Sequence, residues 1–216
     1  MQWIIRFLFS SIGKKLLMAL TGLSFVAFLC LHMIGNLTLY CGGDFFNSYA
    51  STLHKLGYLL TVIEWGLLFL ALVHVAIGLI LFVSNLMARP LRYKVNHWAG
   101  GRTISSATQP YSGLLILVFV VVHLLNFHFA DQSERTIYII VTGLFSSPFY
   151  VALYVLAMIT VAFHVNHGFW SLFQTLGANH PKYMPAVEKA GTLLSIAFGL
   201  GFGSIPLFVL LFAQGV

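Results

Sequence analysis

The segment LTGLSFVAFLCLHMIGNLTLY, residues 20–40, contains a single histidine, His32, inside an apolar run long enough to cross a lipid bilayer. About 20 consecutive apolar residues are enough for a helix to span the hydrocarbon layer. An ionisable side chain is costly there and usually has a function. Three further apolar stretches each contain a comparable histidine, at His74, His123 and His164. This spacing predicts that the chain crosses the membrane once for each of them.

The composition is that of a membrane protein. Of the 216 residues, 59% are hydrophobic and 7% are charged, and the mean hydropathy is +0.93, whereas soluble domains carry about 25% charged residues. The net charge of +6 does not indicate nucleic-acid binding, because the basic residues form no dense cluster. Two cysteines, Cys30 and Cys41, without a CxxC motif predict neither a zinc site nor a covalently attached haem.

Five segments are long and apolar enough to cross the bilayer: 16–40, 57–87, 109–130, 148–176 and 191–214. We therefore expect an all-α membrane protein with five transmembrane helices in one domain, residues 1–216. The first segment is too long for a signal peptide and lacks a cleavage motif, which predicts that it is retained. Pro110 and Pro148 suit the first turns of their helices, and Pro206 is expected to kink the fifth. The short apolar run 137–142 is interpreted as an interfacial segment.

Loop charges predict the orientation, because cytoplasmic loops are enriched in Lys and Arg. Two basic residues, Lys55 and Arg135, fall on one side of the five spans. The N-terminus is therefore expected in the cytoplasm and the C-terminus outside. Nine basic residues fall on the cytoplasmic side, namely Arg6, Lys14, Lys15, Arg89, Arg92, Lys94, Arg102, Lys182 and Lys189.

The helical rise of 1.5 Å per residue converts each histidine position into a depth. His32 and His123 lie about 24 and 21 Å from the cytoplasmic ends of their helices, towards the outer side. His74 and His164 lie about 24–26 Å from the outer ends of theirs, towards the cytoplasmic side. Depth therefore pairs His32 with His123 and His74 with His164. Two imidazoles at each of two levels are what axial ligation of two b-type haems requires, which predicts a four-helix bundle that encloses two stacked haems.

Glycines follow three of these histidines by about one helical turn. Gly35, Gly78 and Gly168 lie on the same helix face as the imidazole before them. A glycine there leaves room for a porphyrin to lie flat against the helix; the alternative is ordinary close packing of helices at small residues. His167, one turn beyond His164, is the rival ligand at that position, and we assign it to a propionate or a quinone-side contact.

Other polar residues give weaker indications. Glu64 is the only carboxylate within a span, about two turns in from the outer surface. It is either an interfacial glutamate that reaches water or a group that exchanges protons with a quinone, whose two-electron reaction moves two protons. Lys94, Arg102 and Lys182 are candidates to neutralise haem propionates, and the sequence does not choose among them. His128 is expected to lie off the ligand face, near the outer surface.

Four segments resemble, in order and spacing, the haem-binding helices of cytochrome b subunits of succinate dehydrogenase and quinol:fumarate reductase. They are LTGLSFVAFLCLHMIGNLTLY (20–40), EWGLLFLALVHVAIGL (64–79), YSGLLILVFVVVHLLNF (111–127) and FHVNHGFWSLFQTLG (163–177). The resemblance covers nearly the whole chain and is closest to the five-helix, two-haem branch. It implies His32 and His123 as distal haem ligands and His74 and His164 as proximal ones. In this family the fourth ligand stands four residues before a glycine, which favours His164 over His167.

The resemblance also implies the partners. The chain would anchor an FAD-containing flavoprotein subunit and an iron–sulphur subunit on the cytoplasmic face of the bacterial cytoplasmic membrane. Menaquinone would be the exchangeable redox partner. Some fumarate reductases of this kind carry a glutamate two residues before the fourth ligand. Ala162 stands there in this chain, so the resemblance does not imply proton compensation by that route.

Two other functions fit part of the pattern. The cytochrome b anchor of a hydrogenase or formate dehydrogenase also uses haems held by two histidines, and co-purifying subunits distinguish it. A histidine-lined metal-ion transporter would place its ligands at one depth beside carboxylates, whereas these histidines lie at two levels and Glu64 alone is embedded. The predicted function is therefore electron transfer between an iron–sulphur subunit and menaquinone, in a direction that the sequence does not determine.

Overall fold

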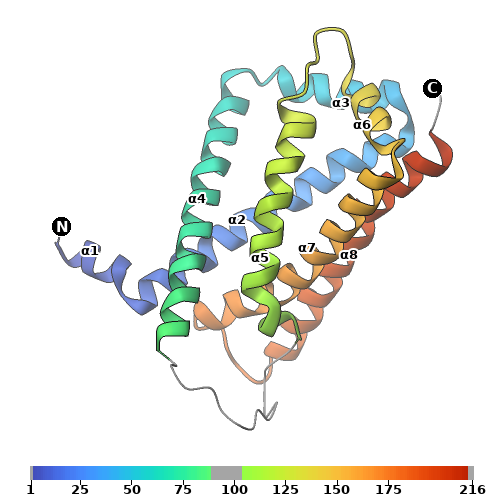
Figure 1. Cartoon of the computed structure of the whole chain (residues 1–216). Helices are drawn as coiled ribbons and strands as arrows, with labels where there is room; N and C mark the ends of the chain where they lie inside the picture. The colour runs from blue at the N-terminus through green and yellow to red at the C-terminus, as the bar shows by residue number, and fades with distance from the viewer. Residues whose placement is uncertain (1, 89–103, 214–216) are drawn as a thin grey trace.

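The computed structural model describes residues 2–88 and 104–213, and within these ranges the chain is helical and contains no strand. Five helices are long and apolar enough to cross a membrane (Figure 1). They are α2 (Ser11–Leu37), α4 (Tyr58–Met87), α5 (Ile104–His123), α7 (Pro148–Thr175) and α8 (Met184–Phe212). The predicted all-α protein with five membrane-length helices is confirmed; its orientation in the membrane stays a prediction.

Three of these helices begin earlier than predicted. α2 begins after Ser10, whose side-chain oxygen accepts a hydrogen bond from the Gly13 amide at 3.0 Å. α5 begins at Ile104, so Pro110 lies inside this helix and not in its first turn. α8 begins at Met184 and continues through Pro206. An apolar-length criterion detects only the part of a helix that matches the hydrocarbon layer, so it misses polar turns that extend the helix beyond it.

Three shorter helices flank the spans: α1 (Gln2–Phe9), α3 (Gly43–His54) and α6 (Ile137–Phe145). α6 contains the apolar run predicted as an interfacial segment, whereas α1 and α3 were not predicted. α3 and α6 contact each other at one end of the bundle, where the Tyr138 amide donates a hydrogen bond to Asn47 Oδ1 at 3.1 Å. The 3-10 turn η1 (Thr38–Cys41) joins α2 to Gly42, whose φ of 96° lets the chain turn into α3.

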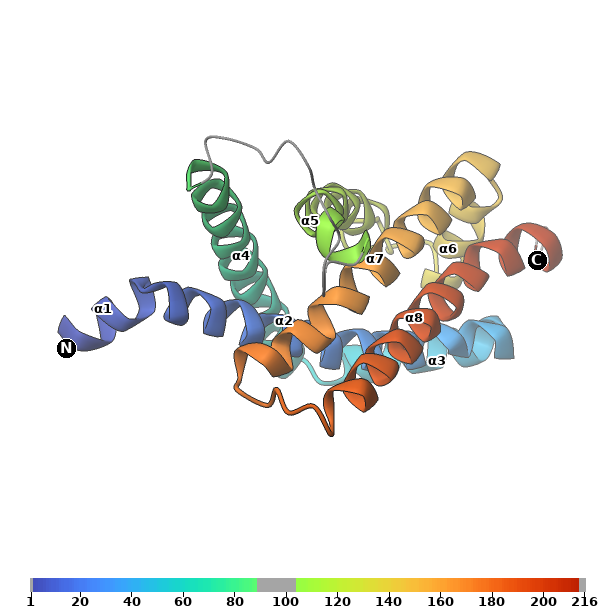
Figure 2. The same ribbon diagram turned by 90° about the horizontal axis from the view of Figure 1, so that it is seen from below.

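Four of the long helices, α2, α4, α5 and α7, form a bundle, and α8 packs outside it against α7 and α2 (Figure 2). α7 contacts both α2 and α5, whereas α4 contacts mainly α2. Buried apolar side chains of α7 and α8 form one core cluster, made of Met158, Val161, Val165 and Phe198. α4 contributes no buried side chain, so the apolar core is built from the other helices.

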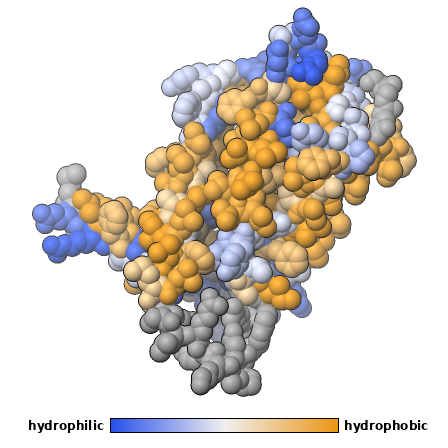
Figure 3. Space-filling model, in the orientation of Figure 1, coloured by the Kyte–Doolittle hydropathy of each residue, from blue (hydrophilic) through white to orange (hydrophobic). Residues whose placement is uncertain are grey.

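The outer surface of the long helices is apolar. On α4, Trp65 is 67% exposed and Phe69 is 65% exposed. Figure 3 shows a largely apolar band between polar groups at the α3/α6 end and at α1. Soluble monomers rarely expose apolar patches larger than a few hundred Å², and this surface suits contact with lipid.

Candidate functional site

The four span histidines form two pairs inside the bundle. The ring centres of His32 on α2 and His123 on α5 are 5.9 Å apart. Those of His74 on α4 and His164 on α7 are 6.4 Å apart. We call the first the upper pair, because His32 and His123 lie near the ends of α2 and α5 that lead towards α3 and α6, and the second the lower pair. These are the partners that depth predicts, while ligation of haem by them stays a prediction.

The two separations suit a metal ion bound by both rings of a pair. A metal–nitrogen bond of about 2.0–2.1 Å, with about 1.1 Å from nitrogen to ring centre, places two ring centres about 6.3 Å apart across one ion. No group of three or more His, Cys, Asp or Glu that could hold a metal occurs among the described residues. Metal sites made of side chains alone normally use three or four ligands. A metal held by one of these pairs would therefore need further ligands, which a macrocycle such as that of haem can supply.

Each ring of the lower pair contacts a hydroxyl group through Nδ1. Thr21 Oγ1, on α2, lies 2.9 Å from His74 Nδ1, and Ser112 Oγ, on α5, lies 3.1 Å from His164 Nδ1. Both hydroxyls also donate within their own helices, Thr21 to the carbonyl four residues before it at 2.8 Å and Ser112 to the carbonyl three residues before it at 3.0 Å. A hydroxyl has one hydrogen, and where it is given to the carbonyl of its own helix the oxygen can accept a hydrogen from the imidazole. Either ring would then carry its hydrogen on Nδ1 and keep a lone pair on Nε2.

Glycines next to these hydroxyl residues lie against the same two rings. A Cβ on Gly22 would lie 3.6 Å from His74 Cε1, and a Cβ on Gly113 would lie 3.3 Å from His164 Cε1. Thr21 with Gly22 and Ser112 with Gly113 thus form equivalent hydroxyl–glycine steps on α2 and α5. Sequence reasoning missed all four residues, because only the rotation of α2 and α5 shows that they face a ligand helix.

Unpaired polar atoms concentrate around the two pairs. The Gln109 amide nitrogen lies 3.5 Å from His164 Nε2 and donates to the His164 carbonyl at 3.3 Å. Among the described residues, three buried side-chain atoms have no hydrogen-bond partner: Gln109 Oε1, His123 Nδ1 and His167 Nδ1. Unpaired polar atoms are costly in an apolar interior. Their position beside the imidazoles is typical of a binding site.

The upper pair is surrounded by aromatic rings. His32 stacks on Phe28 with ring centres 5.1 Å apart and contacts Phe202 of α8 at 5.7 Å. Three further rings lie 5.2–6.1 Å from the His123 ring, namely Phe119, Phe127 and Tyr154. Ring packing therefore positions these imidazoles.

The three glycines predicted to face a porphyrin have other described neighbours. A Cβ on Gly35 would lie 2.5 Å from the Tyr49 ring, so this glycine lets α3 pack against α2. Cβ atoms on Gly78 and Gly168 would lie 3.4 and 3.8 Å from the ends of a methionine and a glutamine side chain. Contact of these glycines with a porphyrin stays a prediction.

The residues predicted to contact propionates are placed only in part. Lys94 and Arg102 lie outside the described residues. Lys182 lies between α7 and α8, with its ammonium group 5.5 Å from the centre of the Tyr183 ring. His167 makes an edge contact with Trp170 at 4.8 Å.

Glu64 lies near the α3/α6 end, close to a second titratable group. Its Oε1 is 4.0 Å from His128 Nδ1, and the two side chains are 44% and 47% exposed. His128 ends a π-helical turn, η2 (Leu124–His128), in which the Phe129 amide donates to the Leu124 carbonyl at 2.9 Å. Such turns are frequent at functional sites. The pairing was not predicted, because a regular α-helix was assumed.

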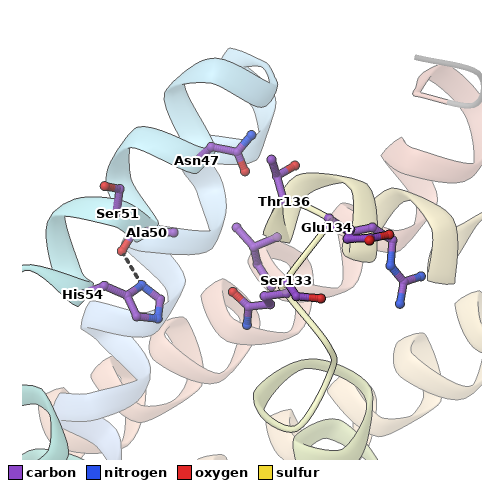
Figure 4. Close-up of a pocket in the computed structure, with 10 residues that line it drawn as sticks. Asn47, Ala50, Ser51, His54, Ser133, Glu134 and Thr136 are labelled. Carbon is purple, nitrogen blue, oxygen red and sulfur yellow. Dashed lines mark hydrogen bonds between the residues drawn. The ribbon is translucent and has the colours of Figure 1, made fainter.

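A polar hollow of about 430 Å³ opens at the same end, between α3 and the segment before α6 (Figure 4). His54, at its rim, donates a hydrogen bond from Nδ1 to the Ala50 carbonyl at 2.8 Å. In the same segment, the Ser133 amide donates to Asp131 Oδ1 at 2.9 Å, which lowers the pKa of that carboxyl group. None of the four span histidines lines this hollow, so it is separate from the two pairs.

Comparisons with family models, with curated proteins and with solved structures found no match. The resemblance to cytochrome b subunits therefore depends on the four sequence segments, and a functional argument must start from the geometry of the histidine pairs.

Proposed function

We propose that the chain is the cytochrome b subunit that anchors a succinate:menaquinone or menaquinol:fumarate oxidoreductase in the bacterial cytoplasmic membrane. It would carry electrons between an iron–sulphur subunit and menaquinone. The observation that supports this most strongly is the pairing of four imidazoles, with ring centres 5.9 and 6.4 Å apart, on four membrane-length helices. The four sequence segments described above point to the same family.

In this proposal, His32 and His123 hold one haem b, and His74 and His164 hold the other. When bound, each haem supplies one-electron chemistry by alternating between ferric and ferrous iron. The chain would supply two pairs of imidazoles, with ring centres 5.9 and 6.4 Å apart, on four apolar helices. At the lower pair, hydrogen bonds from Nδ1 to the hydroxyls of Thr21 and Ser112 would keep the Nε2 lone pairs free.

The chemistry of the dicarboxylate belongs to other subunits. The chain has two cysteines and no flavin-binding fingerprint, whereas an iron–sulphur cluster usually needs four cysteine thiolates. The flavoprotein and iron–sulphur subunits would dock on the cytoplasmic side, where the basic loops are predicted to lie.

We place quinone chemistry beside Glu64 and His128. A half-exposed carboxylate can exchange protons with water, and an imidazole 4.0 Å away can take or return one of them. Glu64→Gln should lower menaquinone turnover by about 10²-fold or more, because it removes a general acid–base group. Haem content should not change. Glu134→Gln, at the rim of the hollow in Figure 4, is the matched control; full quinone turnover in Glu64→Gln would exclude this role.

The deciding experiment is purification of the native complex, with its subunits identified and its haem counted by the pyridine haemochrome method. We expect two haems b per chain, together with a flavoprotein and an iron–sulphur subunit. A nickel or molybdenum subunit would instead identify a hydrogenase or formate dehydrogenase anchor. A preparation without a Soret band would refute the electron-carrier function and favour a metal-ion transporter.

A further inference from the structure

We propose that Thr21 and Ser112 are positioning residues, which fix His74 and His164 in the Nδ1–H form and so present both Nε2 atoms to one metalloporphyrin. This inference rests on the proposed function, because it takes the lower pair to be a haem site. Neither residue belongs to a ligand set that the sequence predicts, and the role follows from hydrogen bonds across helices.

Three contacts suit the same tautomer in both rings of the lower pair. Each hydroxyl lies within hydrogen-bond distance of a carbonyl of its own helix, at 2.8 Å for Thr21 and 3.0 Å for Ser112, so its oxygen can accept from Nδ1 at 2.9 Å beside His74 and at 3.1 Å beside His164. Gln109 supplies the third contact. The Gln109 side-chain atom beside His164 is its amide nitrogen, because the same atom donates a hydrogen bond to the His164 carbonyl. This nitrogen lies 3.5 Å from His164 Nε2, where a lone pair suits a donor.

The two hydroxyls are equivalent in the bundle. The hydroxyl of α2 contacts the ring of α4, and that of α5 contacts the ring of α7. Each is followed by a glycine that lies against the same ring, Gly22 beside His74 and Gly113 beside His164. Ser and Thr hydroxyls commonly donate to a carbonyl of their own helix in apolar helices. This tendency alone does not explain why each imidazole of the lower pair has a hydroxyl beside its Nδ1.

The expected consequence is chemical as well as geometric. A metal binds the neutral imidazole through a free lone pair, and an acceptor on the opposite nitrogen orients the ring and raises its basicity. Loss of such a partner typically lowers metal affinity by about 10- to 100-fold. A less basic axial ligand also stabilises ferric iron less, so the midpoint potential of that haem should rise.

The test uses Thr21→Val and Ser112→Ala in the full chain, with Thr21→Ser and Ser112→Thr as conservative variants that keep the hydroxyl. Ser24→Ala and Thr108→Val are the controls. These hydroxyls lie on the same two helices and donate to carbonyls of their own helices at 3.0 and 2.9 Å. The first readout is ¹⁵N NMR of histidine-labelled, haem-free protein, which distinguishes Nδ1–H from Nε2–H. The second is haem affinity and redox titration of the reconstituted protein.

We expect only the Nδ1–H form at His74 and His164 in the parent chain. Thr21→Val should mix the tautomers of His74 alone, and Ser112→Ala those of His164 alone. Each should weaken the lower haem by about 10- to 100-fold and raise its midpoint potential, without an effect on the upper haem, and the conservative variants should restore both properties.

Unchanged tautomers and an unchanged lower haem in both variants would overturn the inference, as would equal effects in the two controls. If the parent chain bound no haem, the proposed function would fail, and the NMR spectra would still decide whether the two hydroxyls fix these rings.

Discussion

The upper and lower pairs each consist of two imidazoles, but the surrounding residues hold them in different ways. Around His32 and His123 the neighbours are aromatic rings, and His123 Nδ1 has no hydrogen-bond partner among the described residues. Around His74 and His164 the neighbours are hydroxyls, glycines and an amide, together with one aromatic ring, Phe25, whose centre is 5.6 Å from that of His74. The upper rings are therefore oriented by packing, and the lower rings mainly by hydrogen bonds.

The two modes of support differ in their sensitivity to small changes. Packing by rings is spread over many atom pairs, each worth about 0.1–0.2 kcal/mol, so loss of one atom changes little. A hydrogen bond concentrates its effect on one atom and determines which ring nitrogen carries the hydrogen. Single-atom substitutions should therefore disturb the lower pair more than the upper pair.

Removal of an imidazole should have the largest effect on haem content, and this effect should be confined to the pair that loses the imidazole. If the chain binds the two proposed haems, His164→Ala should lose the lower haem and keep the upper one, because it removes one of the two imidazoles that would hold the lower haem. The haem-to-protein ratio should fall from two to one, as measured by pyridine haemochrome.

His167→Ala is the comparison for this experiment, because His167 is the rival ligand one turn from His164 on α7. Loss of a propionate or quinone-side contact removes no haem ligand, so this variant should retain both haems. Loss of the lower haem in His167→Ala, with retention in His164→Ala, would show that the ligand is misassigned.

Alanine at the two lower-pair glycines should have a smaller, graded effect. A Cβ on Gly113 would approach His164 Cε1 to 3.3 Å, which forces the ring to shift by a few tenths of an ångström, whereas a Cβ on Gly22 would make an ordinary contact at 3.6 Å. We expect Gly113→Ala to weaken the lower haem by about tenfold and Gly22→Ala to leave it nearly unchanged, in a haem titration of the reconstituted protein.

Helix propensity helps to interpret this pair of variants. Alanine stabilises a helix interior by about 0.5–1 kcal/mol relative to glycine, so a weaker haem site in Gly113→Ala would not arise from a weaker α5. Equal haem affinity in the two variants would mean that the His164 ring has more freedom than the hydroxyl contact implies.

The spans and the partners within each pair could be predicted because they depend on local properties. Apolar length locates a membrane helix, and the helical rise converts residue number into depth. His32 and His123 were matched in this way without knowledge of any contact, and so were His74 and His164.

What surrounds each pair could not be predicted, because it depends on helix rotation and on contacts between distant segments. Thr21 and His74 are 53 residues apart in sequence, and no local pattern brings them together. Gly35 shows the same limit: Tyr49 of the unpredicted helix α3 lies against it. The π-helical turn that ends at His128 breaks the regular geometry assumed for α5.

The smallest effect is expected at Tyr154, where loss of one atom tests the packing at the upper pair. The Tyr154 hydroxyl accepts a hydrogen bond from Asn126 Nδ2 at 3.0 Å, and its ring lies 6.1 Å from the His123 ring. Tyr154→Phe removes this hydrogen bond and keeps the ring. Because hydrogen bonds between membrane helices average about 0.6 kcal/mol and the half-buried Asn126 donor loses its partner, we expect a destabilisation of about 1 kcal/mol in thermal unfolding.

The proposed upper haem should bind equally well to Tyr154→Phe and to the parent chain. Tyr154→Ala is the contrasting variant: it removes the ring, should cost about 3–5 kcal/mol and should weaken the upper haem. If Tyr154→Phe alone released the upper haem, hydrogen bonding would position both pairs. The two pairs would then differ only in which residues form the hydrogen bonds. The aromatic rings around His123 would remain in place in this variant, and they would not be sufficient for haem binding at the upper pair.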